Sequence, residues 1–200
     1  MKQQKRKDGG NLSEYRDDIR QAVEVLNRGG IILYPTDTIW GIGCDATNAE
    51  AVKRVFEIKQ REDAKALITL VDSEAKVQAY VREMPDVAWD LMEVADSPLT
   101  IIYDGARNLA PNLLAEDGSV GIRVTHETFS NYLCLRFKRP IVSTSANLSG
   151  QPSPRCFADI APEIVAAVDY VCTSRRQETV CPSPSHIIKL GVGGEVKVIR

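Results

Sequence analysis

Hydroxyl side chains gather at two points in this sequence where a run of apolar residues ends. Residues 34–43 (YPTDTIWGIG) contain two threonines, two glycines that allow close backbone approach, and two rings, Tyr34 and Trp40, that could form flat walls. Residues 143–150 (STSANLSG) combine four hydroxyls with one amide. Such loops can donate several hydrogen bonds to a phosphate, a carboxylate or the edge of a base. Each segment could also be a structural turn that its own hydroxyls cap.

Three cations lie close together in the segment 58–65 (IKQREDAK), namely Lys59, Arg61 and Lys65. Lysine supplies a mobile point charge, and arginine supplies a planar fork that fits a phosphate or a carboxylate. The same residues are typical of a solvated helix end, because cations stabilise the negative end of the helix dipole. Spacing alone leaves an anion clamp and a plain helix terminus both open.

The sequence lacks the patterns of several common catalytic sites. It contains no G-x-x-x-x-G-K-[ST] phosphate loop and no G-x-G-x-x-G dinucleotide fingerprint. Its two histidines, His126 and His186, argue against histidine-rich metal centres and most histidine-based triads. A serine nucleophile needs a neighbouring base, and no histidine flanks residues 143–150. The hydroxyl loops therefore favour binding over covalent catalysis.

The hydrophobic pattern alternates between helical and extended segments, which predicts an α/β fold. Helical spacing of apolar residues between Ile19 and Leu26 predicts a first helix, and Asn48 is a candidate cap for a second. Further helices are expected near 73–82, 86–95 and 159–168, and one more helix is expected to include Phe129, Leu133 and Phe137. Strands are expected at 31–34, 66–71, 99–103, 120–124, 140–144, 170–172, 186–190 and 196–199. Neighbouring strands within 99–124 and within 186–199 favour antiparallel pairs, so one mixed sheet with helices on it is the simplest architecture. The polar clusters then fall at strand ends, where α/β proteins commonly place their sites.

Composition limits the class of protein. The chain has 200 residues, 44 % of them hydrophobic, and a formal net charge of −2, so bulk charge does not attach it to nucleic acid. Five cysteines without a C-x-x-C pair favour free thiols in a reducing cytosol. The sequence has neither an apolar run long enough to span a membrane nor a signal peptide behind its basic start. We therefore expect a cytoplasmic protein with no membrane partner. Residues 1–12 are expected to be a flexible tail, or an arm that touches nucleic acid, and 13–200 a single domain.

Taken in order, four motifs resemble those of the YrdC-like threonylcarbamoyl-AMP synthase family. They are residues 35–38 (PTDT), Lys59-x-Arg61, residues 121–124 (GIRV) and residues 143–150. The resemblance extends from the first predicted helix to the C-terminus. It implies a single α/β domain in which a twisted mixed β-sheet with flanking helices surrounds a large concave basic cleft.

The resemblance also implies a reaction. L-Threonine and bicarbonate give an N-carboxy-threonine, whose carboxylate attacks the α-phosphate of ATP to form threonylcarbamoyl-AMP and pyrophosphate. A downstream threonylcarbamoyl-transferase complex then moves the threonylcarbamoyl group to adenosine 37 of tRNA. The implied substrates are therefore ATP, L-threonine and bicarbonate. The implied partners are that complex and tRNA or double-stranded RNA.

The matched positions imply roles for individual residues. Lys59 and Arg61 would hold the triphosphate and stabilise its developing charge, which makes them the expected catalytic residues. Mg²⁺ would bridge the ATP phosphates, because no carboxylate cage for a dedicated metal is evident. The other nucleotide contacts are expected from Ser143, Ser145, Asn147 and Arg200, and the threonine contacts from Thr36, Arg123 and Ser185.

Two segments depart from the family's pattern. Residues 96–100 (DSPLT) stand where P-G-P-x-T is usual, and residues 184–189 (PSHIIK) where P-S-T-[VI]-[VI]-D is usual. These departures keep open a YciO-like paralogue with a different substrate. A second alternative is a module that binds double-stranded RNA or the ribosome without turnover. RNA binding by shape requires cations but not the Ser145-Ala146-Asn147 set, which separates the two readings.

Overall fold

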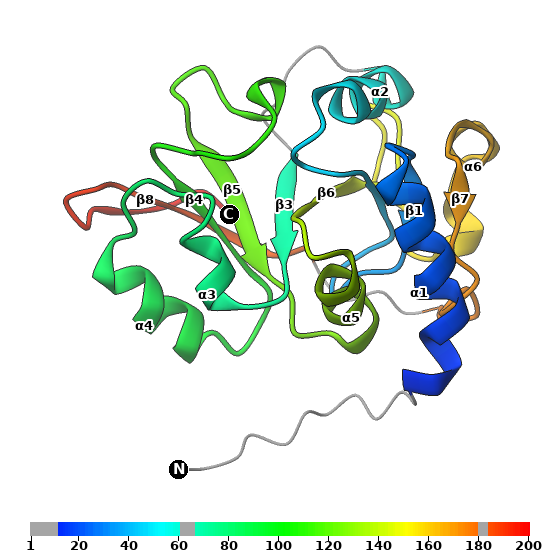
Figure 1. Cartoon of the computed structure of the whole chain (residues 1–200), viewed down its shortest axis with the longest axis horizontal. Helices are drawn as coiled ribbons and strands as arrows, with labels where there is room; N and C mark the ends of the chain where they lie inside the picture. Colours follow the sequence, from blue (N-terminus) through cyan, green and yellow to red (C-terminus); the bar gives the residue numbers. More distant parts are fainter. Residues whose placement is uncertain (1–11, 61–66, 180–183) are drawn as a thin grey trace.

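The computed structural model describes residues 12–60, 67–179 and 184–200. Within them the chain forms a nine-stranded mixed sheet with helices packed against it (Figure 1). The strands are β1 (Ile32–Tyr34), β2 (Gly41–Gly43), β3 (Ile68–Val71), β4 (Leu99–Tyr103), β5 (Val120–Val124), β6 (Ile141–Ser145), β7 (Tyr170–Val171), β8 (His186–Leu190) and β9 (Val196–Val198). The helices are α1 (Leu12–Asn27), α2 (Ala49–Lys59), α3 (Glu74–Val77), α4 (Asp86–Val94), α5 (Thr128–Phe137) and α6 (Pro162–Ala167), with short 3₁₀ helices η1 (Pro111–Leu113) and η2 (Phe157–Asp159).

The order of the strands brings distant polar loops together. The sheet runs β7-β1-β2-β6-β3-β5-β4-β8-β9. β1 and β2 form an antiparallel pair, and β2 pairs antiparallel with β6, where Gly41 lies opposite Ser145. The loop that joins β1 to β2 therefore lies close to the end of β6. The predicted antiparallel pairs are confirmed as β4–β5 and β8–β9.

The hydrophobic core has two parts. The larger part joins α1, α2 and α5 to β1, β2 and β6, and α1 packs along α5. The smaller part joins α3 and α4 to β4, β5 and β8. Figure 1 shows α3 and α4 beside one half of the sheet and α1 beside the other. Each half of the sheet thus packs against its own cluster of apolar side chains.

Buried thiols belong to the larger part of the core. Cys44, Cys134 and Cys172 are free and buried there. Burial raises the pKa of each thiol well above its ordinary value, because the thiolate would lose its hydration. These three cysteines therefore act as small apolar core residues. Cys181 lies outside the described residues.

Most predicted elements occur, with differences in extent. Asn48 caps α2 as predicted, since its Oδ1 accepts from the Glu50 and Ala51 amides at 3.0 and 3.2 Å. α3 is a single turn, shorter than the helix expected at 73–82. β2 was not expected, because residues 41–43 read as part of a loop. Of the predicted tail, 1–11 lie outside the described residues, and Leu12 begins α1.

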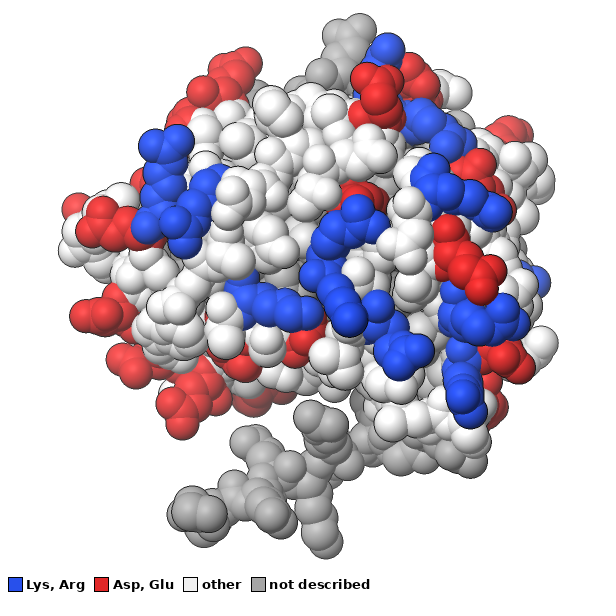
Figure 2. Space-filling view, in the orientation of Figure 1, with Lys and Arg blue, Asp and Glu red and all other residues white. Residues whose placement is uncertain are grey.

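The surface carries both signs of charge. On the face shown in Figure 2, basic and acidic side chains alternate over the region of α1 and α2. This pattern agrees with the small net charge of −2. No helix within the described ranges is long and apolar enough to cross a membrane.

Candidate functional site

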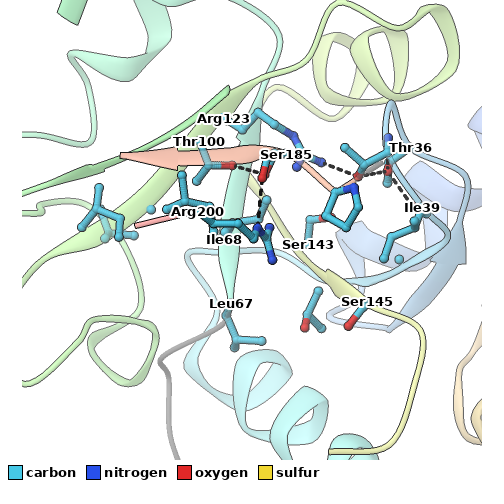
Figure 3. Close-up of a pocket in the computed structure, with 18 of the residues that line it drawn as sticks. Thr36, Ile39, Leu67, Ile68, Thr100, Arg123, Ser143, Ser145, Ser185 and Arg200 are labelled. Carbon is cyan, nitrogen blue, oxygen red and sulfur yellow. Dashed lines mark hydrogen bonds between the residues drawn. The ribbon is translucent and has the colours of Figure 1, made fainter. Parts of the chain in front are cut away.

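A cavity of about 370 Å³ is lined from both halves of the sheet. Its walls come from the β1–β2 loop, β2 and β6 on one side, and from β3, β4, β5 and the segment before β8 on the other. Figure 3 shows hydroxyl side chains and two arginines around this space. The volume is in the range of sites for small molecules.

The β1–β2 loop presents two buried hydroxyls to the cavity. Pro35 follows β1 directly, and the loop then turns so that the Thr36 hydroxyl donates to the Ile39 carbonyl at 2.6 Å. The Thr38 amide donates back to Thr36 Oγ1 at 3.1 Å, and the two threonine hydroxyls lie 3.1 Å apart. These local bonds fix both hydroxyls before any ligand arrives.

Arg123 places a buried positive charge beside these threonines. Its side chain, on β5, is 3 % exposed. One terminal nitrogen lies 2.8 Å from Asp37 Oδ1 and 3.3 Å from Thr38 Oγ1. Its Nε is buried and has no hydrogen-bond partner in the described part of the chain. Arg123 also lines the cavity, and a guanidinium is suited to bind an anion such as a carboxylate.

The end of β6 contributes a second wall of hydroxyls to the cavity, and Lys59 binds the backbone of this segment. Ser143, Thr144 and Ser145 all line the cavity. Lys59 is 2 % exposed at the end of α2, and its Nζ donates to the Ser145 carbonyl at 2.6 Å and the Asn147 carbonyl at 2.8 Å. The ammonium group thus holds the backbone of this loop in place.

Asn147 stabilises the same loop through its amide. Its Nδ2 donates to the Leu148 and Gln151 carbonyls at 2.9 and 2.7 Å. Its Oδ1 is buried without a partner among the residues described. Asn147 is therefore an internal brace whose acceptor oxygen is still unused.

A third polar corner lies where the segment before β8 meets β4. Thr100 Oγ1 and Ser185 Oγ are 2.9 Å apart, and both residues are buried. Arg200 Nε donates to the Ser185 carbonyl at 3.2 Å, and the Arg200 amide bonds to Ile187. Figure 3 shows Thr100, Ser185 and Arg200 together on one side of the space. Residues from β4 and from the C-terminal segment thus form one hydrogen-bonded unit.

The structure brings most of the sequence-predicted site residues to one place. Those that line the cavity are Thr36, Arg123, Ser143, Ser145, Ser185 and Arg200. Lys59 and Asn147 do not line it but hold the loop after β6. Arg61 lies outside the described residues. The expected roles of all nine in substrate binding stay predictions.

Sequence reasoning missed several cavity residues and misplaced two rings. Thr100, Ser119 and Ser153 also line the cavity, as do Thr38 and Gly41 of the predicted 34–43 loop. Thr38 belongs to a motif that the sequence analysis recognised. Thr100 lies inside a predicted strand, and only the pairing of β4 with β8 reveals which way its side chain points. The two rings, Tyr34 and Trp40, are buried in the core instead of forming cavity walls.

The charge of the cavity differs from what the resemblance led us to expect. Of the described residues that line it, Arg123 and Arg200 are the charged ones, and Arg123 is paired with Asp37. Lys65, like Arg61, lies outside the described residues. The large basic cleft is therefore not shown and stays a prediction.

The arrangement can bind and orient an anionic ligand. Hydroxyls converge from three sides, and Arg123 supplies a guanidinium. The described residues contain no group of three or more His, Cys, Asp or Glu side chains that could hold a metal ion. Such a site acts through alignment and stabilisation of negative charge.

Comparison with known proteins gives consistent similarities in sequence. Residues 24–200 match the model of the Sua5/YciO/YrdC family, whose description reads "Telomere recombination". A threonylcarbamoyl-AMP synthase from Pseudoalteromonas translucida is 34 % identical over 155 residues, which covers 76 % of this chain and 83 % of the relative.

Two solved structures are similar in fold. Sua5 of P. abyssi, complexed with L-threonine, aligns with a TM-score of 0.74 and 25 % identity over 86 % of this chain, which spans 50 % of that Sua5 chain. YciO of E. coli aligns with a TM-score of 0.77 and 25 % identity, covering 91 % of this chain and 87 % of YciO. Fold similarity alone therefore does not separate these two relatives.

Proposed function

This chain belongs to the Sua5/YciO/YrdC family, and from that premise we propose that it is an enzyme that forms threonylcarbamoyl-AMP and pyrophosphate from L-threonine, bicarbonate and ATP. The observation that carries the proposal is the meeting of the two hydroxyl loops with Arg123 in one cavity. A relative named threonylcarbamoyl-AMP synthase and a Sua5 structure with L-threonine support it.

The amino-acid end of the reaction fits the corner formed by Thr36, Thr38 and Arg123. The guanidinium of Arg123, which lines the cavity, would bind the α-carboxylate of threonine. Thr36 would seat the amino acid, and Ser185 would contact it from the opposite wall. Each of these groups is held by its own neighbours, so binding costs little reorganisation.

The nucleotide end fits the loop after β6. The hydroxyls of Ser143 and Ser145 would donate to phosphate oxygens, and Arg200 would add positive charge. Lys59 and Asn147 would also belong to the nucleotide site. The hydrogen bonds from Lys59 to the Ser145 and Asn147 carbonyls fix the loop that presents these donors. Arg61, in the adjoining segment, would hold the triphosphate.

Mg²⁺ would come with ATP, bound to its phosphates, and would neutralise part of their charge. The donor set of the cavity agrees with that assignment, because it offers hydroxyls and arginines instead of a carboxylate cage. The protein's own part is to align the two reactants.

The chemical step itself needs little covalent help from the protein. The threonine amine first bonds to the carbon of bicarbonate and loses water to give the N-carboxylate. One oxygen of that carboxylate then bonds to the α-phosphorus of ATP, and the bond to the β-phosphate bridging oxygen breaks to release pyrophosphate. Aligned donors on the phosphoryl oxygens lower this barrier, because negative charge redistributes there.

The product points to partners outside this chain. An activated threonylcarbamoyl group must be consumed by a transferase, and we assign that role to a complex that modifies adenosine 37 of tRNA in the cytoplasm. Direct contact of this chain with tRNA or double-stranded RNA is part of the same hypothesis.

The alternatives have less support. A YciO-like paralogue shares the fold, but the relatives named threonylcarbamoyl-AMP synthase favour the synthase. A module that only binds RNA would not require the buried guanidinium of Arg123 in the cavity or the paired hydroxyls of Thr100 and Ser185.

The deciding experiment measures pyrophosphate release. Purified protein is incubated with ATP, Mg²⁺, bicarbonate and, in separate reactions, L-threonine, L-serine or L-valine. We expect release that depends on both threonine and bicarbonate, together with a product that has the mass of threonylcarbamoyl-AMP. Release with another amino acid in place of threonine would favour the paralogue, and retardation of RNA without any release would favour the binding module.

A matched pair of variants checks the site. Ser185→Ala removes a buried hydroxyl of the cavity, and Ser97→Ala removes an exposed hydroxyl that does not line it. We expect Ser185→Ala to raise the KM for threonine by about tenfold, whereas Ser97→Ala should match the wild type. Equal kinetics in both variants would remove Ser185 from the site.

A further inference from the structure

The carbonyl of Thr36 is held by a residue that lies outside the cavity. The hydroxyl of Thr36 bonds within its own loop, but its carbonyl oxygen accepts from Arg175 Nη1 at 3.0 Å. Arg175 follows β7 and does not line the cavity. The position of Thr36 is therefore coupled to a segment remote in sequence.

Arg175 adopts a backbone conformation that its residue type avoids. Its φ is +61°, in the left-handed region where a Cβ atom is crowded. Such a conformation persists where the surroundings fix it. Here the preceding turn is fixed by Asp18 of α1, which accepts from the Thr173 and Ser174 amides at 3.0 and 2.7 Å. Asp18 is buried, so this anchor is shielded from water.

The guanidinium of Arg175 is fixed as firmly as its backbone. Its Nη1 also lies 3.1 Å from Glu127 Oε1, and its Nε donates to Glu178 Oε1 at 2.8 Å. Glu127 is itself immobilised, because it caps α5 by accepting from the Phe129 and Ser130 amides at 2.8 and 2.9 Å. The side chains of Arg175 and Glu127 are 13 % and 11 % exposed, so the ion pair between them is largely desolvated.

We propose that Arg175 is a positioning residue for the amino-acid subsite, which ties the β1–β2 loop to α1 and α5 and so holds Thr36 and Thr38 in the orientation that receives the substrate. The inference rests on the proposed function for the identity of that substrate. The structural part of the proposal, that Arg175 holds residues 36–40 in place, depends only on the contacts described above. Arg175 touches no reacting group, so it should affect binding of the amino acid more than binding of ATP.

Two measurements test the proposal. Arg175→Gly removes the side chain and accepts the left-handed backbone without strain. Hydrogen exchange of the unliganded protein should then be faster by about tenfold at residues 36–40, because the loop loses a charge-assisted hydrogen bond. In the pyrophosphate assay, the KM for L-threonine should rise by about tenfold while the KM for ATP stays within about twofold.

The control variants separate positioning from general stability. Arg175→Lys keeps the charge, and it should restore part of the threonine KM. Glu178→Gln removes an outer ion pair without touching Thr36 or Glu127, and it should behave as wild type in both measurements.

Unchanged exchange at residues 36–40 in Arg175→Gly would overturn the proposal. Equal rises in the KM values for threonine and ATP would also overturn it. If the wild type releases no pyrophosphate while Arg175→Gly still speeds exchange at 36–40, the tether is supported and the proposed function fails.

Discussion

Lys59 and Arg123 are buried cations with different surroundings. The ammonium group of Lys59 donates to two backbone carbonyls of the loop after β6. Arg123 pairs with Asp37, and its buried Nε has no hydrogen-bond partner among the residues that the structure describes. Residue type and spacing predicted positive charge at both positions, but the direction of each side chain depends on tertiary contacts. The sequence could therefore identify these cations, though not which of them supports a loop.

The role of Lys59 gives the first prediction. Lys59→Met keeps the apolar stem but leaves the Ser145 and Asn147 carbonyls without this donor. We expect the free energy of unfolding to fall by about 2 kcal/mol and the rate of pyrophosphate release to fall by at least about tenfold, because the loop that presents Ser143 and Ser145 shifts. Urea unfolding and the pyrophosphate assay measure the two effects.

Lys53 on the same helix provides the control. Its side chain is 66 % exposed and lies 4.0 Å from Glu57, so Lys53→Met should change stability by less than about 0.5 kcal/mol. A Lys59→Met protein as stable as Lys53→Met would contradict the bracing role of Lys59.

At the scale of elements, the sequence predicted most strands and helices, including the two-residue β7, but it missed β2. β2 has three residues, two of them glycine, so it carries no periodic signal of its own. It exists because β1 and β6 pair with it on both sides. Gly43 is required there, since a Cβ atom would lie 2.6 Å from a ring carbon of Tyr34. Such a constraint appears only once the sheet is assembled.

Helix α2 offers a test of local capping, which the sequence did predict. Asn48→Ala removes the acceptor of the Glu50 and Ala51 amides and should destabilise the protein by about 1 kcal/mol. Ser73 occupies the same place before α3 but makes no capping bond, so Ser73→Ala should cost less than about 0.5 kcal/mol. Thermal or urea unfolding of both variants gives the comparison. Equal losses of unfolding free energy in the two variants would mean that the capping bonds of Asn48 do not stabilise α2.

Asp169 joins three elements and makes stability depend on pH. It accepts from the Ile31 amide before β1 at 2.6 Å, and its carboxylate lies 2.9 Å from Arg54 of α2. Burial alone would raise the pKa of Asp169, but the bonds from Arg54 and from Ile31 outweigh burial and lower it. Because the folded pKa lies below the unfolded value, this stability is present above the unfolded pKa and is lost as pH falls through the folded pKa.

The variant Asp169→Asn should therefore be less stable than the wild type at neutral pH by about 1 kcal/mol, since the pair is more than a third exposed. The difference should shrink as pH falls below about 4. Urea unfolding at pH 7 and at pH 3 measures both values. A difference that stays constant over this range would mean that the charge of Asp169 does not contribute.

For the whole molecule, the order of the strands explains why the site could be predicted only in part. Each polar segment is visible in the sequence, yet their meeting depends on the sheet order, with β2 between β1 and β6 and β8 beside β4. The cavity then lies between walls that belong to the two parts of the core. Thr100 and Ser185 become neighbours through this pairing and through nothing local.

Because its walls come from both halves of the sheet, a ligand that fills the cavity should stabilise the entire fold. We expect a non-hydrolysable ATP analogue with Mg²⁺ to raise the melting temperature, and L-threonine with bicarbonate to raise it further. At one hundred times its dissociation constant a ligand contributes about 2.7 kcal/mol, which is about 5–10 °C for a chain of this size. Arg200→Ala, which removes a cavity arginine, should reduce the shift with the nucleotide, whereas Ser97→Ala should leave it unchanged. A shift with the nucleotide but none with threonine would indicate a different second substrate, and no shift with either would mean that this cavity is not the substrate site.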